Sequence, residues 1–357
     1  MTIHVFWFTE PSDNKPGVYQ FSNQEIQKNF LIEFAKYDKV VWHHANTRGR
    51  VTDDPNDILV GHPPWPPAAV KGNGQFENWA FDNGFAPGET HPNTFMVYPW
   101  ARAFVSHPAT DPYVEMFLKC RALFGMGGTD HYDFNIVHAE PDTLWRRTQK
   151  NFVRINMGCD ARILPYKTAA HGREPGMLHV SSLRGYKRPE HMLASVPVHG
   201  CALYIATENT ENVQKLAAEG RLKQKNIFVV GALDNGNPAA NDFILNKCSY
   251  YFHLAREPQA TTILENAGRG LVPLITGRSG FYCPDAIYLT DDDPMENQRI
   301  VKEALSMPDE EYARRSGAVR QHILTYHSWE RICGHMYKAM RALIEGGDVP
   351  RRGEDYS

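Results

Sequence analysis

The chain has 357 residues, of which 42% are hydrophobic and 22% are charged, and its formal net charge is −3 at pH 7. This length favours two globular domains of ordinary size, and the composition excludes a disordered chain or a coiled coil. No apolar run reaches the roughly 18 residues that a membrane-spanning helix needs. Neither half of the chain is basic enough to be a nucleic-acid-binding module.

The N-terminal stretch MTIHVFWF lacks the basic region and the cleavage site of a signal peptide. The six cysteines are scattered along the chain and include no CxxC pair. We therefore expect a cytoplasmic protein whose thiols are reduced and buried, with no zinc site.

The first part of the chain is predicted to form an α/β domain over residues 1–170. A buried strand at 3–8, a polar loop at 9–17 and an amphipathic helix at 22–35 are typical of the opening of a doubly wound fold. No GxGxxG is present, which argues against a dinucleotide site. Further strands are predicted at 39–42, 58–60, 95–97 and 134–138, and helices at 112–124 and 142–152.

Imidazole and indole side chains follow several of these predicted strands, at the edge where open α/β sheets bind ligands. Such rings can stack on a sugar and form hydrogen bonds with it, although aromatic residues in long loops also pack the loop itself. The candidates are His62, Trp100 and His107.

A polar linker at 167–176 precedes a second α/β domain, predicted over residues 171–328. Strands are expected at 178–180, 202–206, 227–230, 271–275 and 287–289, with another ending near residue 254. The helices between and after them are expected at 189–196, 209–219, 238–247, 261–267, 294–305 and 309–326. A last helix runs from 328 to about 344, and the tail is polar.

Residues 250–281, YYFHLAREPQATTILENAGRGLVPLITGRSGF, organise this second domain. Glu257 precedes a predicted helix start and Glu265 lies inside that helix. A helix N-terminus binds phosphate through its unpaired amides, and a carboxylate can accept hydrogen bonds from two neighbouring hydroxyls. A sugar nucleotide presents hydroxyls on both sides of a diphosphate, although two solvated glutamates would show the same spacing.

The stretch resembles the Glu-x7-Glu motif of retaining GT-B glycosyltransferases, specifically the large family-four group. The matching residues are Glu257, Leu264-Glu265-Asn266-Ala267, Gly270, Val272-Pro273-Leu274-Ile275 and Gly280. The resemblance implies two Rossmann-like domains that face each other across a cleft, with the donor bound to the second domain and the acceptor to the first. It also implies that residues 329–357 form a helix that returns to the first domain, with a polar tail.

A second segment, GMLHVSSLRGYKRPEHMLASV, is similar to the family's "Val-Gly-Arg-Leu, three residues, Lys-Gly" motif, whose cations neutralise the leaving diphosphate. Lys187 matches the family Lys. Ser181 and Ser182 stand where Gly and Arg are usual, which is a departure from the pattern. Arg184 is close enough in sequence to supply the second cation that a diphosphate leaving group needs.

The resemblance assigns catalytic roles to Lys187, Arg184 and Glu257, with Glu257 orienting the donor sugar and Glu265 holding the ribose. The turn that begins at Gly231 is similar to the family's nucleobase loop. Gly17 lies in the first loop, which the family uses to approach the donor phosphates. The full set of donor-binding candidates is Gly17, Ser182, Gly231, Leu233, Thr261, Thr262, Ile263 and Glu265.

The implied function is retaining transfer of a sugar from a UDP- or GDP-sugar to a hydroxyl acceptor, without a metal or a tightly bound cofactor. The commonest family role is synthesis of a surface or lipid-linked glycan. Three alternatives remain: glycosylation of a modified, phage-type DNA base, a same-fold sugar-nucleotide epimerase, and a non-catalytic nucleotide-sugar binder. A DNA acceptor is not indicated by charge, because phosphate contacts need Lys and Arg.

Overall fold

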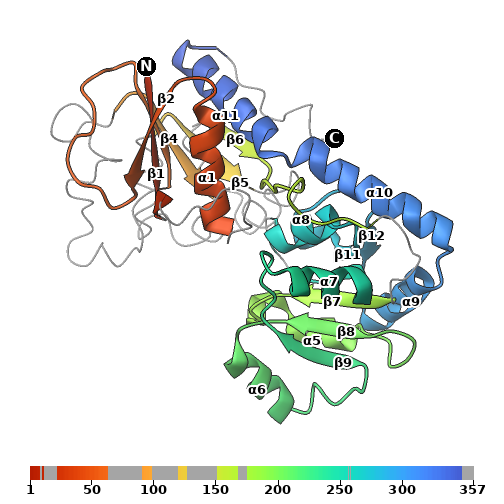
Figure 1. The fold of residues 1–357 in the computed structure, drawn as a ribbon. Helices are drawn as coiled ribbons and strands as arrows, with labels where there is room; N and C mark the ends of the chain where they lie inside the picture. Colours follow the sequence, from red (N-terminus) through yellow and green to blue (C-terminus); the bar gives the residue numbers. More distant parts are fainter. Residues whose placement is uncertain are drawn as a thin grey trace. The chain divides into compact units, whose positions relative to one another are not determined.

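The structure is a computed structural model of the full chain. It describes residues 1–8, 10–11, 22–62, 91–98, 120–126, 151–167, 175–255, 257 and 259–347. The chain forms two compact units, each built on its own parallel sheet (Figure 1). Unit 1 comprises residues 1–16, 20–158 and 329–357, and unit 2 comprises residues 17–19 and 159–328.

Unit 1 contains a six-stranded parallel sheet in the order β2-β1-β3-β4-β5-β6. Its first strand is buried from Ile3 to Trp7, the near-continuous apolar pattern of a sheet covered on both faces. The strands are β1 (Thr2–Trp7), β2 (Lys39–His44), β3 (Ile58–Gly61), β4 (Thr94–Tyr98), β5 (Ala122–Met126) and β6 (Asn151–Ile155).

Two helices of unit 1 come from opposite ends of the sequence, α1 (Ser22–Phe34) and α11 (Trp329–Ile344). They pack against each other, with the ring of Phe30 edge-on to Trp329 and the rings of Tyr37 and Tyr337 stacked 4.4 Å apart. A Cβ on Gly158 would lie 2.3 Å from the Trp329 ring, so glycine is needed where this indole docks. The last helix therefore belongs to unit 1.

Two helix predictions in this unit are wrong at their C-terminal ends, where the structure has strands. The helix predicted at 112–124 overlaps β5, and the one predicted at 142–152 overlaps the start of β6. Both segments pair in register with neighbouring strands and are largely buried, so ladder hydrogen bonds override local helix propensity. The remainder of both predicted helices and the strand predicted at 134–138 lie outside the described residues.

Unit 2 contains a second six-stranded parallel sheet, in the order β12-β11-β10-β7-β8-β9. Its strands are β7 (Gly176–Val180), β8 (Leu203–Ala206), β9 (Ile227–Gly231), β10 (Cys248–His253), β11 (Val272–Thr276) and β12 (Ile287–Leu289). Its helices are α5 (Pro189–Ala194), α6 (Thr210–Ala218), α7 (Pro238–Lys247), α8 (Thr261–Gly268), α9 (Pro294–Leu305) and α10 (Asp309–Tyr326).

Side-chain caps explain where several of these helices begin. Asn209, Asn237 and Asp293 each accept hydrogen bonds from first-turn amides of α6, α7 and α9. Pro238 and Pro294 occupy first-turn positions, where the missing N–H costs nothing. These local signals account for the close agreement between the predicted and observed helix starts in unit 2.

Unit 2 begins at Cys159, earlier than the domain start predicted at residue 171. The amide of Cys159 donates to the carbonyl of His327 at 2.8 Å, and Ala161 and Leu164 lie against Gly268 of α8. The ring of Tyr166 lies 4.4 Å from the Arg320 guanidinium. The polar linker composition did not reveal these contacts, because they join residues more than a hundred positions apart.

All six cysteines are buried and none forms a disulfide, as predicted. No helix within the described part of the chain is long and apolar enough to cross a membrane.

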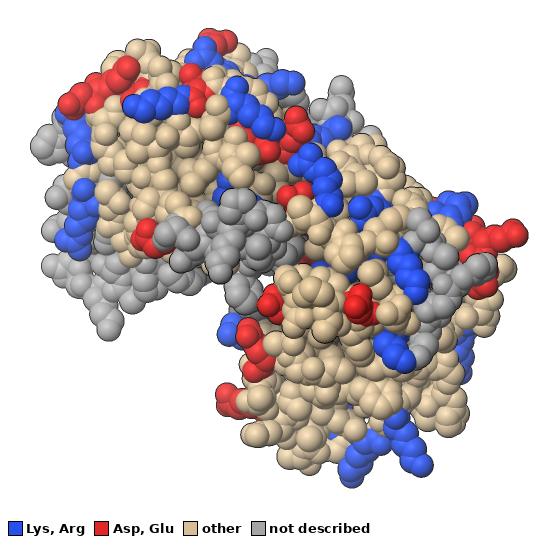
Figure 2. All heavy atoms as spheres, in the orientation of Figure 1, with Lys and Arg blue, Asp and Glu red and all other residues tan. Residues whose placement is uncertain are grey.

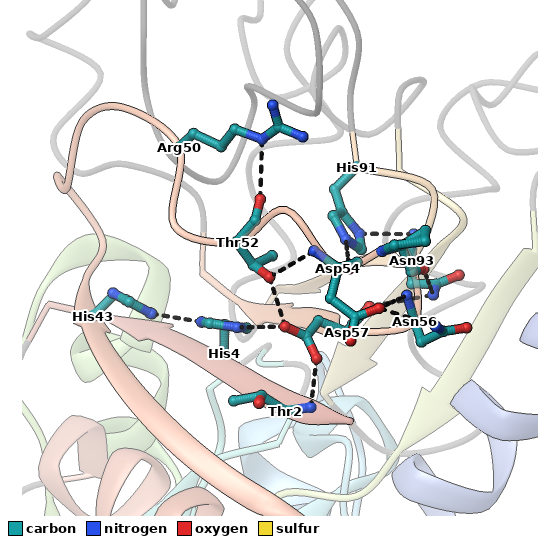
Figure 3. Close-up of polar contacts among 11 residues, drawn as sticks. Thr2, His4, His43, Arg50, Thr52, Asp54, Asn56, Asp57, His91 and Asn93 are labelled. Carbon is teal, nitrogen blue, oxygen red and sulfur yellow. Dashed lines mark hydrogen bonds and ion pairs between the residues drawn. The ribbon is translucent and has the colours of Figure 1, made fainter.

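Figure 3 shows a polar cluster in unit 1 that is anchored at the amino-terminal ends of β1 and β3. The carboxylate of Asp57 accepts hydrogen bonds from the Thr2 amide and the Thr52 hydroxyl, both at 2.6 Å, and lies 3.2 Å from His4 Nε2. The other nitrogen of His4 lies 2.8 Å from His43 Nε2. Parallel sheets bind ligands at the opposite, carboxyl-terminal edge, so we interpret this cluster as structural.

The cluster predicts a loss of stability in mild acid. Burial, with a smaller contribution from His4, lowers the pKa of His43 to about 4 from an ordinary value of 6.5. Between these values the unfolded chain binds a proton at this position that the folded chain does not, so the free energy of unfolding falls as pH falls through this window. Between pH 7.5 and pH 5, the free energy of unfolding should fall less in His43→Gln than in the unsubstituted protein, by on the order of 1 kcal/mol.

Urea unfolding at pH 7.5, 6 and 5 tests this expectation. The matched control is His199→Gln, because His199 is exposed and should not change the pH dependence. Parallel pH dependences for His43→Gln and the unsubstituted protein would contradict it.

Candidate functional site

The candidate site lies at the carboxyl-terminal ends of β7 and β10 in unit 2. The two strands are parallel neighbours in the sheet, so the loops that follow them leave from the same edge. Residues 181–188 follow β7 and residues 254–260 follow β10. This edge of an open α/β sheet is where ligands bind.

An ion pair joins the two loops. The Lys187 ammonium donates to Oε1 of Glu257, and each side chain is only 14% exposed. Lys187 ends a 3-10 turn that begins at Gly185, and Arg188 continues the chain in the left-handed conformation with φ 54°. The structure therefore brings together two of the three predicted catalytic residues, which are 70 positions apart in sequence.

A histidine that the motif did not single out completes this contact. Nε2 of His253, the last residue of β10, lies 3.1 Å from the same Oε1 of Glu257. Burial alone would raise the pKa of the Glu257 carboxyl, but its contacts with His253 and Lys187 outweigh burial and lower the pKa to about 2. Glu257 is consequently ionised throughout the pH range in which ordinary proteins work.

Three buried rings lie side by side beneath the site. His253 stacks on His179 of β7 at 5.7 Å between centroids, and on Tyr251 of β10 at 5.9 Å. All three residues are fully buried. Tyr251 and His253 are two apart on β10 and so share a face of the sheet, and His179 contacts His253 from the neighbouring strand β7, near the carboxyl-terminal ends of both strands.

The outer rings of the stack hold the loops. His179 Nδ1 lies 2.8 Å from the carbonyl of Phe252, which can only accept, so this nitrogen carries the proton and Nε2 accepts from the Ser181 hydroxyl at 2.7 Å. Burial, together with His253, lowers the pKa of His179 to about 3. Ser181 in turn accepts from the Leu183 amide at 3.1 Å, in a turn where Leu183 has φ 52°.

On the other side of the stack, the Tyr251 hydroxyl donates to Oγ1 of Thr262 at 2.6 Å. Thr262 lies in the first turn of α8, whose N-cap residue Ala260 makes no side-chain hydrogen bond. The predicted phosphate-binding residues Thr261 and Thr262 therefore occupy a helix N-terminus without a side-chain cap, and Ile263 donates its amide to Ala260.

The second glutamate of the motif has its own support. Glu265 is 6% exposed and accepts a hydrogen bond from Nδ2 of Asn235 at 2.9 Å. The buried guanidinium of Arg269 donates to Oδ1 of Asn235 at 2.8 Å and also to Asn241. These bonds hold the loop after β9 close to α8. Of the predicted nucleobase residues, Gly231 ends β9 and Leu233 lies in this loop.

The other predicted residues are placed as follows. Arg184 is exposed at the start of the 3-10 turn, and its carbonyl accepts from the Lys187 amide at 2.7 Å. The carbonyl of Ser182 accepts from Asn212 of α6. His62 of unit 1 is fully buried, with its ring edge-on to Trp7 and Phe8. Gly17, Trp100 and His107 lie outside the described residues.

Sequence reasoning missed His179, Tyr251, His253 and Asn235. The one available signal was that His253 and Tyr251 alternate along a predicted strand that runs directly into Glu257. The structure places no group of three or more His, Cys, Asp or Glu among its described residues in a position to hold a metal ion.

No protein-family model and no curated protein matches this chain. Solved structures do match its fold. A glycosyltransferase from Rickettsia africae ESF-5 superimposes with a TM-score of 0.62 at 10% identity, over 97% of this chain and 99% of that one. AviGT4, a glycosyltransferase involved in avilamycin A biosynthesis, gives a TM-score of 0.56 at 14% identity, over 97% and 98%.

A third match is a trehalose-6-phosphate structure from E. coli bound with UDP-2-fluoro glucose. Its TM-score is 0.62 at 11% identity, over 96% of this chain and 99% of that one. With two Rossmann-like units and two parallel sheets, the chain has the GT-B fold, as predicted.

The shared contact at Glu257 predicts a stability effect that depends on both partners. Replacing Lys187 by Met leaves a largely buried carboxylate with one partner fewer, which should reduce the free energy of unfolding by about 1 to 3 kcal/mol. Adding Glu257→Gln should recover part of that loss, because the amide carries no charge to desolvate. Urea unfolding of the single and double variants at pH 7 measures both effects.

The exposed pair Arg299–Glu303 of α9 provides the control. Arg299, which also pairs with Glu296, is fully exposed, so Arg299→Ala should change the free energy of unfolding much less than Lys187→Met does. If the double variant is no more stable than Lys187→Met, the charged Glu257 does not destabilise the fold when Lys187 is absent, which would contradict the prediction.

Proposed function

We propose that this protein is a retaining glycosyltransferase that moves a sugar from a nucleoside-diphosphate sugar to a hydroxyl acceptor. The observation that carries the proposal is the arrangement around α8 in unit 2. Glu257, paired with Lys187, precedes the uncapped N-terminus of the helix, and Glu265, held by Asn235, lies inside it. Both carboxylates of the motif are thus held by specific partners, unlike solvated surface glutamates.

The donor fits this arrangement in three parts. The first-turn amides of α8 and the Thr262 hydroxyl suit a diphosphate, because a helix N-terminus carries partial positive charge. Glu265 would accept hydrogen bonds from the ribose hydroxyls, and Glu257 from the sugar. The E. coli structure of the same fold holds UDP-2-fluoro glucose, which supports a UDP-sugar donor, and a GDP-sugar is the other candidate.

In the proposed mechanism the sugar–phosphate bond breaks and the leaving diphosphate takes the bonding electrons. Lys187 and the α8 amides stabilise that developing charge, which is the largest requirement of the reaction. Departure and attack on the same face of the sugar retain its configuration, with the phosphate accepting the proton of the acceptor hydroxyl. Arg184, which is exposed and lies three residues before Lys187 in the sequence, is the proposed second cation. The proposed mechanism requires no metal.

For the acceptor we propose a surface or lipid-linked glycan made in the cytoplasm, with Trp100 and His107 as candidate acceptor-side residues in unit 1. The third candidate, His62, is fully buried against Trp7 and Phe8, so it would support the acceptor side only through packing. Figure 2 shows one face of the molecule, on which Lys and Arg are interspersed with Asp and Glu. That pattern gives no support for a DNA acceptor, which would need a run of phosphate-binding cations.

The second candidate function is a non-catalytic nucleotide-sugar binder. The specific observation in its favour is that Ser181 and Ser182 stand where an Arg-bearing motif is usual, and that the Ser181 hydroxyl is already bonded within the loop. Such a protein would bind the donor but release no nucleoside diphosphate. An epimerase would release it without an acceptor.

A thermal-shift screen with UDP, GDP and their sugar conjugates tests the donor site. A ligand that binds only the folded state stabilises it by RT ln(1 + L/Kd), where L is the ligand concentration, so the melting temperature rises with the ratio of ligand concentration to Kd. We expect one sugar nucleotide to stabilise the protein, and Glu265→Gln to weaken its binding about tenfold or more, because the amide cannot accept from both ribose hydroxyls. Glu310→Gln, an exposed substitution on α10, is the control. Unchanged affinity in Glu265→Gln would remove the ribose role.

The role of Lys187 is tested by kinetics. Lys187→Ala should reduce kcat by about a hundredfold or more while donor affinity changes only about fivefold, because the ammonium acts mainly on charge that develops in the transition state. Release of nucleoside diphosphate measures turnover, and calorimetry measures donor affinity. Equal losses in both quantities would mean that Lys187 only anchors the donor.

A further inference from the structure

Glu257 is held asymmetrically. Lys187 Nζ and His253 Nε2 both contact the same oxygen, Oε1. None of the described residues donates a hydrogen bond to the other oxygen, Oε2. A glutamate carboxylate otherwise rotates freely about its last torsion. The Lys187 hydrogen bond and the 3.1 Å contact with His253, both on one oxygen, limit that freedom.

The geometry of His253 is itself fixed. Its ring is fully buried and lies between the rings of His179 and Tyr251, with interplanar angles of 28° and 18°. Neither ring nitrogen of His253 makes an aligned hydrogen bond with the described residues. Nε2 lies 3.1 Å from Oε1 of Glu257, so the contact between the two side chains is electrostatic.

We propose that His253 is a positioning residue: together with Lys187 it fixes Oε1 of Glu257, so that Oε2 faces the sugar of the donor. This inference rests on the proposed function and names the group that makes the site prefer a sugar nucleotide over the bare nucleotide. Oε2 has two lone pairs with which to accept hydrogen bonds from the sugar hydroxyls.

The same stack links this contact to the rest of the site. His179 holds Ser181 in the Lys187 loop, and Tyr251 holds Thr262 at the start of α8. The Tyr251 hydroxyl lies 2.6 Å from Oγ1 of Thr262 and 3.3 Å from the carbonyl of Val180, so it ties the start of α8 to the end of β7. The three stacked rings thus contact the loop that carries Lys187, the carboxylate of Glu257 and the first turn of α8, which is proposed to bind phosphate.

The first test needs no ligand. In protein labelled with ¹³C at Glu side chains, the signal of the Glu257 carboxyl carbon, assigned by its loss in Glu257→Gln, is followed against pH. His253→Phe keeps a stacking ring but removes the N–H, and should raise the Glu257 titration midpoint by about one pH unit or more. His253→Gln, whose amide reaches the position of Nε2, should restore most of the shift. An unchanged midpoint in His253→Phe overturns the proposal.

The second test uses calorimetry with UDP, GDP, UDP-glucose and GDP-mannose. In His253→Phe, the affinity for the sugar nucleotide should fall about tenfold while the affinity for the matching bare nucleotide stays within about twofold, and His253→Gln should recover the difference. Equal losses for both ligands, or no recovery in His253→Gln, would indicate a merely structural ring and overturn the proposal.

Two controls keep the tests decisive. His327→Phe replaces another buried histidine of unit 2, which packs on Phe281, and should leave the Glu257 titration unchanged. If His253→Phe does not fold, His253→Asn replaces it, because this shorter amide cannot reach Glu257. If the unsubstituted protein binds none of the four ligands, the proposed function fails, while the titration still decides whether His253 holds Glu257.

Discussion

The parallel pairing of β7 with β10 is the constraint on which the candidate site depends. It brings the loop of Lys187 to the loop of Glu257 at one edge of the sheet, although the two residues are 70 positions apart. The opposite charges then form a largely buried pair, and a second contact with Nε2 of His253, 3.1 Å from the same carboxylate oxygen, helps to offset its desolvation cost. Without this strand pairing, the cation and the carboxylate would be two unrelated surface groups.

The buried ring stack shows how the sheet itself contributes to the site. Imidazoles in a protein core are stable only when neutral and supplied with hydrogen bonds, and His179 meets both conditions through Phe252 and Ser181. Each ring faces a different loop, so the packing that makes the core rigid also sets the positions of the polar groups above it. His179, Tyr251 and His253 therefore both pack the core and position the polar groups of the candidate site.

Ser181 and Ser182, which stand where the motif that the sequence resembles has Gly and Arg, have their own structural role. The Ser181 hydroxyl bonds to His179 and to the Leu183 amide and so ties the turn to β7, whereas Lys187 remains the largely buried cation of the loop. Lys187 is paired with Glu257, so a diphosphate would share this ammonium with the carboxylate. The same loop holds two further cations, the exposed Arg184 and Arg188, which is paired with Asp292.

The α/β class with two domains and almost all elements of unit 2 could be predicted from the sequence, because periodicity and caps are local properties. Motif spacing likewise singled out Glu257 and Glu265 as candidates. Tertiary structure alone decided that 122–126 and 151–155 are strands, that residues 159–167 pack on unit 2, and that His253 and Asn235 hold the two glutamates. The hydrogen bond from Asn235 to Glu265 spans 30 residues and that from His179 to Phe252 spans 73. Contacts at such separations arise from strand pairing, which local patterns do not encode.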